Sequence, residues 1–344
     1  MTSACILGCS GLELTPEERA LFRDARPWGF ILFKRNVGDP DQVRELIQSF
    51  RDCVDRSDAP VLIDQEGGRV QRLGPPHWRR YPTGRAYGEA GGGDPMLRRA
   101  LARLGGRLLA HDLKALGINV DCAPVLDTPS PGAHDVIGDR AYGRDWETVA
   151  ELGRAVAEGL LAGGVLPVIK HAPGHGRAGA DSHLDLPVVD AAYDELEWTD
   201  FRPFRACSDM PMAMTAHVVY PAIDEGRPAT TSPDAIRLIR ETLGFDGLLM
   251  TDDLSMKALC GAFEDRARQA LHAGCDVVLH CNGDMNEMRG VLAGCGELKG
   301  EPLRRARAAL NRIVREVEPL DEAAARARFA EAFPETAAPP SAPS

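Results

Sequence analysis

The sequence lacks the features that mark several large classes of protein. No apolar run approaches the roughly 18 residues that a membrane helix needs. Residues 1–19 carry no basic segment and only a short apolar run, so we do not expect a secretory signal there. Positive charge is in deficit, with 40 Lys and Arg against 51 Asp and Glu and a net charge of −11. Because phosphate binding needs basic patches, neither nucleic acid nor a membrane is an expected partner.

The cysteines lack the spacing of a metal or redox motif. There are nine of them, an odd number, and none forms a C-x-x-C pair. Most lie within apolar runs, as Cys5, Cys122 and Cys275 do. This pattern favours reduced thiols in the core of a cytoplasmic protein over a disulfide framework.

What the chain does have is apolar material for a large core, since 44% of its residues are hydrophobic. Eight short, continuously apolar runs alternate with amphipathic stretches, which is typical of buried parallel strands separated by helices. We therefore predict one α/β domain, a (β/α)₈ barrel over residues 1–320, followed by an Ala/Pro-rich tail at 321–344 that is expected to be poorly ordered. The runs are Ala4–Gly8, Gly29–Phe33, Pro60–Asp64, Ile118–Val125, Leu166–His171, Met212–Val218, Leu248–Asp252 and Val277–His280.

A doubly wound open sheet is the alternative fold for such a pattern. That fold usually carries a glycine-rich phosphate loop after its first strand, and the residues from Gly8 to Gly11 do not match one. In a barrel, the polar residues that end these runs would gather at the carboxyl ends of the strands, where barrel active sites lie. They are Asp64, Lys170, His171, His217, Asp252, Asp253 and Asn282.

The segment with most chemistry runs from Lys170 to His183 and contains three histidines. A metal site is one interpretation, but a Pro-Gly pair separates His171 from His175, so the two cannot share a helix face. Buried structural histidines are a second interpretation. Acid–base chemistry is a third, because Asp181 precedes His183 by two residues and can orient its imidazole as a proton donor. The glycine-rich stretch 174–181 predicts a mobile loop.

Three further segments place charged side chains beside these histidines. One aspartate of the pair after the seventh run, Asp253, is expected to cap the following helix, which leaves Asp252 as a nucleophile or charge stabiliser at the barrel mouth. Asp64 and Arg72 flank a Gly-Gly turn that either holds sugar hydroxyls or an amide carbonyl, or is a solvated surface turn. Arg140 lies in a loop after another strand.

Together these motifs resemble the single-domain β-N-acetylglucosaminidases of glycoside hydrolase family three, the bacterial cytosolic type that acts in peptidoglycan recycling. The family pattern K-H-F-P-G-H-G, D-[ST]-H and [ST]-D-D-L-x-M stands here as KHAPGHG, DSH and TDDLSM. The segments ILFKRN, IDQEGGRVQR, APVLD and GDRAY extend the resemblance over residues 4–285. One departure is Ala172, where the family usually has Phe, and it puts the affinity of the sugar pocket in question.

The resemblance implies a retaining enzyme that releases GlcNAc from GlcNAc–1,6-anhydro-MurNAc, with or without its peptide. It assigns Asp252 as nucleophile, His183 as acid/base and Asp181 as its orienting partner. Further implications are a cytoplasmic monomer with no metal and no cofactor. A glycoside phosphorylase and a non-catalytic sugar-binding barrel are the alternatives. The residues implied to hold the sugar ring are Asp64, Arg72, Arg140, Lys170 and His171.

Overall fold

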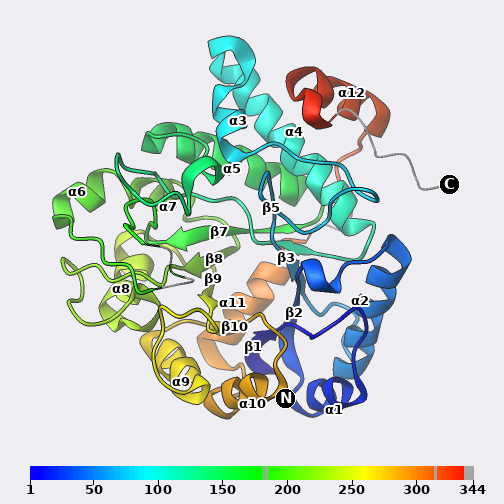
Figure 1. Ribbon diagram of the computed structural model, residues 1–344, viewed down its shortest axis with the longest axis vertical. Helices are drawn as coiled ribbons and strands as arrows, with labels where there is room; N and C mark the ends of the chain where they lie inside the picture. Colours follow the sequence, from blue (N-terminus) through cyan, green and yellow to red (C-terminus); the bar gives the residue numbers. More distant parts are fainter. Residues whose placement is uncertain (181, 183–184, 314–315, 337–344) are drawn as a thin grey trace.

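The computed structural model describes residues 1–180, 182, 185–313 and 316–336. Its central sheet is a closed barrel of parallel strands in the order β1-β10-β9-β8-β7-β6-β3-β2 (Figure 1). Each of the eight runs predicted from the sequence overlaps one of these strands, so the (β/α)₈ barrel is confirmed. The strands are β1 (Ser3–Leu7), β2 (Pro27–Leu32), β3 (Val61–Ile63), β6 (Val120–Asp121), β7 (Leu166–Ala172), β8 (Met212–Thr215), β9 (Leu248–Asp253) and β10 (Val277–His280).

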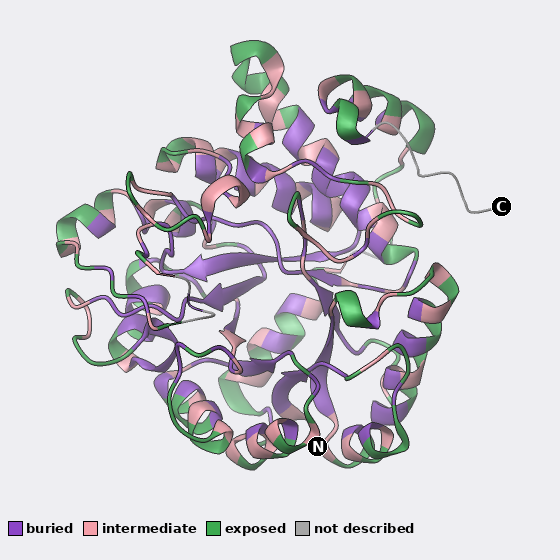
Figure 2. Cartoon of the chain, viewed as in Figure 1, coloured by how far each residue is buried: buried purple, intermediate pink, exposed green. Residues whose placement is uncertain are grey.

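The strands are apolar along most of their length because both of their faces are buried, as Figure 2 shows, and polar residues stand mainly at their carboxyl ends. Inward-facing side chains, Ile6, Leu62 and Met250 among them, fill the inside of the barrel. Outward-facing side chains pack against the surrounding helices in a second, larger cluster that includes Phe30 and Ile63. All nine cysteines are free, and seven are buried.

Several of the surrounding helices begin at a capping side chain. α1 (Pro16–Ala25) starts with a capping box, in which Thr15 and Glu18 bond each other's backbone amides. The segment that follows Ser232 forms the short α8 (Pro233–Arg237) and then a π-helical turn, Leu238–Thr242. The other helices are α2 (Pro40–Val54), α3 (Gly84–Glu89), α4 (Pro95–Lys114), α5 (Trp146–Ala162), α6 (Tyr193–Trp198), α7 (Arg202–Ala206), α9 (Phe263–Ala273), α10 (Met285–Gly294), α11 (Gly300–Leu310) and α12 (Glu322–Ala332). Among the described residues, no helix is long and apolar enough to cross a membrane.

A small hairpin, β4 (Gln65–Gly67) and β5 (Val70–Gln71), follows β3 at the barrel mouth. Its turn depends on Gly67, which has a φ of 101°. A Cβ atom on Gly67 would lie 2.2 Å from the carbonyl oxygen of Pro82, so only glycine fits. The Gly-Gly pair is therefore part of a packed hairpin that projects from the end of a barrel strand, not an isolated surface turn.

The expectation of a poorly ordered tail is wrong for residues 322–336. This segment forms α12 and a short 3₁₀ turn that pack against the chain near α4 (Figure 1). The buried Phe329 ring lies 6.1 Å from Tyr81 and 6.2 Å from Tyr87, measured between ring centroids. Two aromatic residues four apart, Phe329 and Phe333, are the signal in the sequence that indicates this packing. Residues 337–344 lie outside the described part of the chain.

Replacing Phe329 with alanine is expected to lower the free energy of unfolding by about 3–5 kcal/mol, because it empties the centre of this aromatic cluster. Arg328→Ala, on the exposed side of the same helix, is the matched control and should change stability by less than about 0.5 kcal/mol. Urea unfolding measures both. Equal midpoints for the two variants would show that α12 adds nothing to the fold.

Candidate active site

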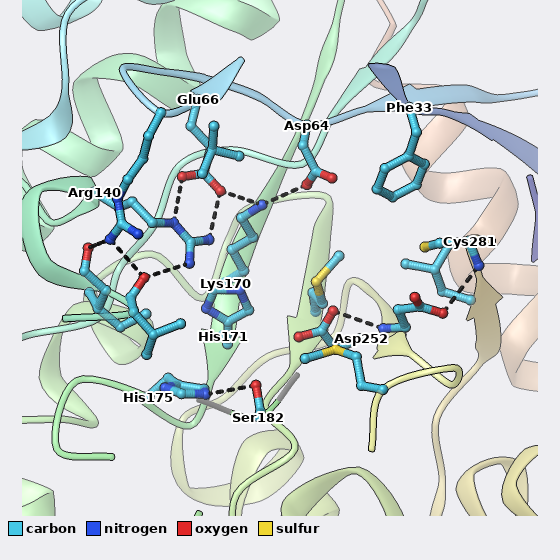
Figure 3. A pocket seen from close by; sticks show the side chains of 18 of the residues that line it. Phe33, Asp64, Glu66, Arg140, Lys170, His171, His175, Ser182, Asp252 and Cys281 are labelled. Atoms are coloured by element: carbon cyan, nitrogen blue, oxygen red, sulfur yellow. Dashed lines mark hydrogen bonds and ion pairs between the residues drawn. The ribbon is translucent and has the colours of Figure 1, made fainter. Parts of the chain in front are cut away.

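A polar cavity of about 270 Å³ opens at the carboxyl ends of the barrel strands (Figure 3). Six residues that the sequence predicted for the site line it: Asp64, Arg72, Arg140, Lys170, His171 and Asp252. The structure therefore brings together side chains from three strand ends and two loops. Asp181 and His183 lie outside the described residues. Ser182, which stands between them in the chain, lines the cavity.

Five charged side chains form a linked cluster on one wall of this cavity, and Figure 3 shows Asp64, Glu66, Arg140 and Lys170 among them. The Lys170 ammonium donates to Asp64 Oδ1 at 2.9 Å and lies 2.7 Å from Glu66 Oε1. Arg72 donates to the other oxygen of Asp64 at 3.0 Å. Arg140 makes a two-pronged pair with Glu66, both distances being 2.8 Å. The two carboxylates are thus shared among three cationic side chains.

Burial disfavours the charged forms in this cluster, but pairing outweighs it. Burial alone would raise the pKa of the Glu66 carboxyl, and the positive charges of Arg140 and Lys170 lower it instead to about 2. The pKa of Asp64 is likewise held well below its usual range by Lys170 and Arg72, against the effect of burial. The pKa of Lys170, which burial would lower, is raised by the same two carboxylates. Near pH 7 the cluster therefore presents fixed charges for binding hydroxyl and amide groups.

A second buried group holds His171 at the cavity. Asp127 Oδ2 lies 2.7 Å from His171 Nδ1, and because a carboxylate only accepts, Nδ1 carries the proton. Asp127 Oδ1 also accepts from the backbone amides of His171 and His175, at 3.1 and 2.7 Å. These bonds and the charge of His171 lower the pKa of Asp127 to about 2, although burial opposes them. The pairing leaves His171 Nε2 as the ring nitrogen free to meet a ligand.

His175 fits the structural interpretation of the buried histidines better. Its Nε2 lies 3.3 Å from Ser182 Oγ, and the ring packs edge-on against His171. Burial and the neighbouring His171 lower the pKa of His175 to about 4, so the ring is neutral near pH 7. Among the described residues, no group of three or more His, Cys, Asp and Glu side chains is placed to hold a metal ion.

The expected mobile loop is packed in its first half. Residues 174–176 are buried, and Ala178 is 1% exposed. A Cβ atom on Gly176 would lie 2.0 Å from the carbonyl oxygen of Thr128, so this glycine allows close packing against a neighbouring loop. Arg177 adds an ion pair to the buried Asp200 at 2.6 Å. Glycine content predicted mobility here, but close backbone approach is what these glycines provide.

The acidic pair at the end of β9 behaves differently from the prediction in one respect. Asp252 lines the cavity, as expected. Asp253 does not cap a helix, because the next helix, α9, starts ten residues later at Phe263. Its carboxylate accepts instead from the amides of Ser255 and Cys281, at 3.0 and 3.1 Å, and ties β9 to β10. The Asp253 amide donates to Asp252 Oδ1 at 2.8 Å.

Electrostatics keep Asp252 ionised. Burial raises the pKa of its carboxyl, but the nearby His171 and the hydrogen bond from the Asp253 amide lower it, and the net pKa lies below the usual value. An ionised carboxylate at the mouth of a barrel can attack an electrophilic carbon or stabilise a positive charge that develops on it.

Sequence reasoning missed three residues of the site. Glu66 and Asp127 organise its cations and its histidine, yet both stand in motifs that drew attention to other positions, IDQEGGRVQR and APVLD. Phe33 contributes an aromatic wall, with the Arg72 guanidinium 4.9 Å from its ring centroid. Ala172 is buried and is not among the lining residues, so the departure from the family pattern lies behind the cavity wall.

Comparison with known proteins agrees with this arrangement. Residues 9–316 match the sequence model of the glycosyl hydrolase family 3 N-terminal domain. The beta-hexosaminidase of Nitrosomonas eutropha is 40% identical over 281 residues, 80% of each chain, and that of Alkalilimnicola ehrlichii is 42% identical over 282 residues, again 80% of each. Among solved structures, NagZ from Neisseria gonorrhoeae in complex with N-trifluoroacetyl-D-glucosamine superposes with a TM-score of 0.84 and 33% identity. The match covers 99% of this chain and 98% of that one.

Three observations indicate the same family. They are the fold, the order of the site segments and the similarity over most of the chain. A carboxylate on β9 faces a cation-rich wall that can hold hydroxyl and amide groups, within a barrel whose strand ends carry the polar residues. The chain therefore belongs to glycosyl hydrolase family 3 and is a beta-hexosaminidase of that family.

Proposed function

We propose that the protein is a retaining exo-β-N-acetylglucosaminidase that removes terminal GlcNAc from peptidoglycan fragments, namely GlcNAc–1,6-anhydro-MurNAc with or without its peptide. The observation that carries the proposal is the ionised Asp252 facing the wall of Asp64, Lys170 and Arg140 across one small cavity. A cavity of about 270 Å³ suits a single sugar ring better than a chain of sugars, which supports removal from the chain end. The Neisseria relative was solved with a glucosamine derivative.

In the proposed reaction, Asp252 is the nucleophile that forms the covalent glycosyl-enzyme. Asp64, Arg72, Arg140, Lys170 and His171 hold the hydroxyl and acetamido groups of the sugar. His183, oriented by Asp181, gives a proton to the leaving oxygen and then takes one from the water that releases GlcNAc. Support for the last assignment is the position of Ser182, the residue between them, at the cavity. The proposal extends to a monomeric cytoplasmic enzyme, in keeping with the recycling role implied by the sequence motifs.

The test follows the first product formed from GlcNAc–1,6-anhydro-MurNAc by proton NMR, with and without inorganic phosphate. We expect free GlcNAc to appear first as the β-anomer, because two displacements at the anomeric carbon restore its configuration. Phosphate should not change the product. A first product of α-configuration would exclude the covalent intermediate, and a glycosyl phosphate would identify a phosphorylase.

The role of His183 predicts a dependence on the leaving group. In His183→Ala, cleavage of GlcNAc–1,6-anhydro-MurNAc should slow by about 10²- to 10⁴-fold, because the alkoxide must leave without a proton. p-Nitrophenyl β-N-acetylglucosaminide releases a stabilised phenolate, so formation of the glycosyl-enzyme from it should slow far less. Pre-steady-state release of p-nitrophenol measures that step. The comparison variant is His175→Ala, because His175 is a buried histidine of the same segment whose ring is neutral near pH 7. Equal losses on both substrates would argue against an acid role for His183.

A further inference from the structure

His217 is a strand-end histidine that neither the sugar-binding wall nor the proposed acid–base pair uses. It follows β8 and its side chain is fully buried. Its Nε2 lies 3.0 Å from the backbone carbonyl oxygen of Asp253, at the end of β9. Its Nδ1 lies 2.7 Å from the hydroxyl of Thr230, which is also buried. Both ring nitrogens are therefore engaged, one by the strand that carries Asp252.

The bonding partners determine which nitrogen carries the proton. A backbone carbonyl only accepts, so His217 Nε2 must be the donor to Asp253. Burial lowers the pKa of His217, and although Asp252 and Asp253 pull it upward, the net shift is downward. The ring is therefore neutral near pH 7, and its Nδ1 accepts from the Thr230 hydroxyl. Thr215 supplies the next hydroxyl, 2.8 Å from that of Thr230.

Asp253 links this histidine to the reacting carboxylate. Its amide donates to Asp252 Oδ1 at 2.8 Å, while its carbonyl accepts from His217 and from the amide of Met256, at 3.0 and 3.1 Å. Its own carboxylate binds the amide of Cys281 at 3.1 Å (Figure 3). The backbone that orients the Asp252 carboxylate is thus anchored to β10 on one side and, through His217, to β8 on the other.

We propose that His217, whose Nε2–H donates to the Asp253 carbonyl while its Nδ1 accepts from the Thr230 hydroxyl, is a positioning residue that fixes the Asp252 carboxylate for attack on the anomeric carbon. The inference rests on the proposed role of Asp252 as nucleophile. His217 itself touches neither sugar nor leaving group in this scheme. Loss of its bond leaves the Asp253 carbonyl held by the Met256 amide alone, which loosens the backbone next to the peptide whose N–H orients Asp252. A displacement of the nucleophile by about 1 Å costs roughly 100-fold in rate.

The test compares His217→Leu with His280→Leu. His280 is also a fully buried strand-end histidine, but its Nε2 pairs with Glu287 at 3.0 Å and has no bond to β9. With p-nitrophenyl β-N-acetylglucosaminide, His217→Leu should lower kcat by about 10- to 100-fold and change KM by less than about threefold. His280→Leu should lose comparable thermal stability and keep its kcat. Equal kcat values in the two variants would overturn the proposal.

A conservative variant separates positioning from general loss of structure. The amide nitrogen of His217→Gln reaches about as far as Nε2 does, so this variant should recover most of the lost kcat. Thr230→Val removes the hydroxyl that binds Nδ1 and orients the ring, so it should lower kcat, whereas Thr230→Ser should not. If His217→Leu does not fold, the Thr230 pair decides the matter, and a full kcat in Thr230→Val overturns the inference.

These outcomes are distinguishable from failure of the proposed function. If Asp252→Asn retains activity, Asp252 is not the nucleophile and the proposed function fails first. If Asp252→Asn is inactive while folded His217→Leu keeps its kcat, the nucleophile stands and only the positioning role of His217 is lost. A raised KM at unchanged kcat in His217→Leu also rejects positioning, because it places His217 in ground-state binding.

Discussion

Asp252→Asn is expected to lower kcat by about 10⁴-fold or more on any β-N-acetylglucosaminide while the protein stays folded. A neutral amide is too weak a nucleophile to form the covalent intermediate at a useful rate. The replacement keeps the shape of the side chain, and the asparagine oxygen can still accept from the amide of Asp253, now at 2.8 Å from Asp252 Oδ1. The loss should therefore appear in catalysis and not in folding.

The measurement is p-nitrophenol release beside thermal unfolding followed by circular dichroism. Glu287→Gln is the matched control, because it neutralises another carboxylate close to a strand end, one that pairs with His280 and does not line the cavity. We expect that control to keep the wild-type kcat. Near pH 7 the stability of Asp252→Asn should be modestly lower than that of wild type, because the ionised carboxylate is favoured in the folded state. Because the folded-state pKa of Asp252 is lowered, the wild-type advantage is present above the unfolded pKa and disappears as the pH falls. Turnover by folded Asp252→Asn within tenfold of wild type would reject Asp252 as nucleophile.

The barrel could be predicted because its signals are local. Each strand lies within a short run of apolar residues, and the capping box at Thr15 marks the start of α1. The errors have local causes as well. Glycine content indicated mobility at Gly176, where the structure uses the missing side chain for contact with Thr128. The alanine and proline content of residues 321–344 predicted a poorly ordered tail and gave no sign of α12. The packing of α12 depends on Phe329 and Phe333 rather than on an apolar stripe.

The site could be predicted only in part, because its pairings are not local. Asp252 and Lys170 were found as polar residues that end apolar runs, which the barrel then brings together. Glu66 meets Arg140 from 74 positions away, and Asp127 meets His171 from 44 positions away. No spacing rule in a sequence connects such residues. Which buried charges pair with each other depends on how the barrel closes. These pairings are what the structure adds most to the sequence.

Lys170→Met is expected to cause the largest combined loss of stability and activity. The ammonium is 2% exposed and bridges Asp64 and Glu66, at 2.9 and 2.7 Å. Methionine fills a similar volume but leaves both buried carboxylates with one cation fewer, Asp64 relying on Arg72 and Glu66 on Arg140. Removing one partner from a buried ion pair costs about 3–5 kcal/mol. Activity should fall by about 100-fold or more, because the sugar loses a donor and the wall becomes more negative.

Urea unfolding and p-nitrophenol release test this variant beside Arg154→Met, which breaks the more exposed pair with Asp209 and should cost less than about 1 kcal/mol. Lys170→Arg should not restore activity, since the compact ammonium has two oxygens within 3 Å and a guanidinium is wider. The raised pKa of Lys170 and the lowered pKa values of Asp64 and Glu66 keep this contribution intact near pH 7. Wild-type stability in Lys170→Met would mean that Arg72 and Arg140 alone neutralise the wall. Lost activity at unchanged stability would then assign Lys170 to sugar binding alone. The charged cluster would in that case bind the sugar without contributing to the stability of the fold.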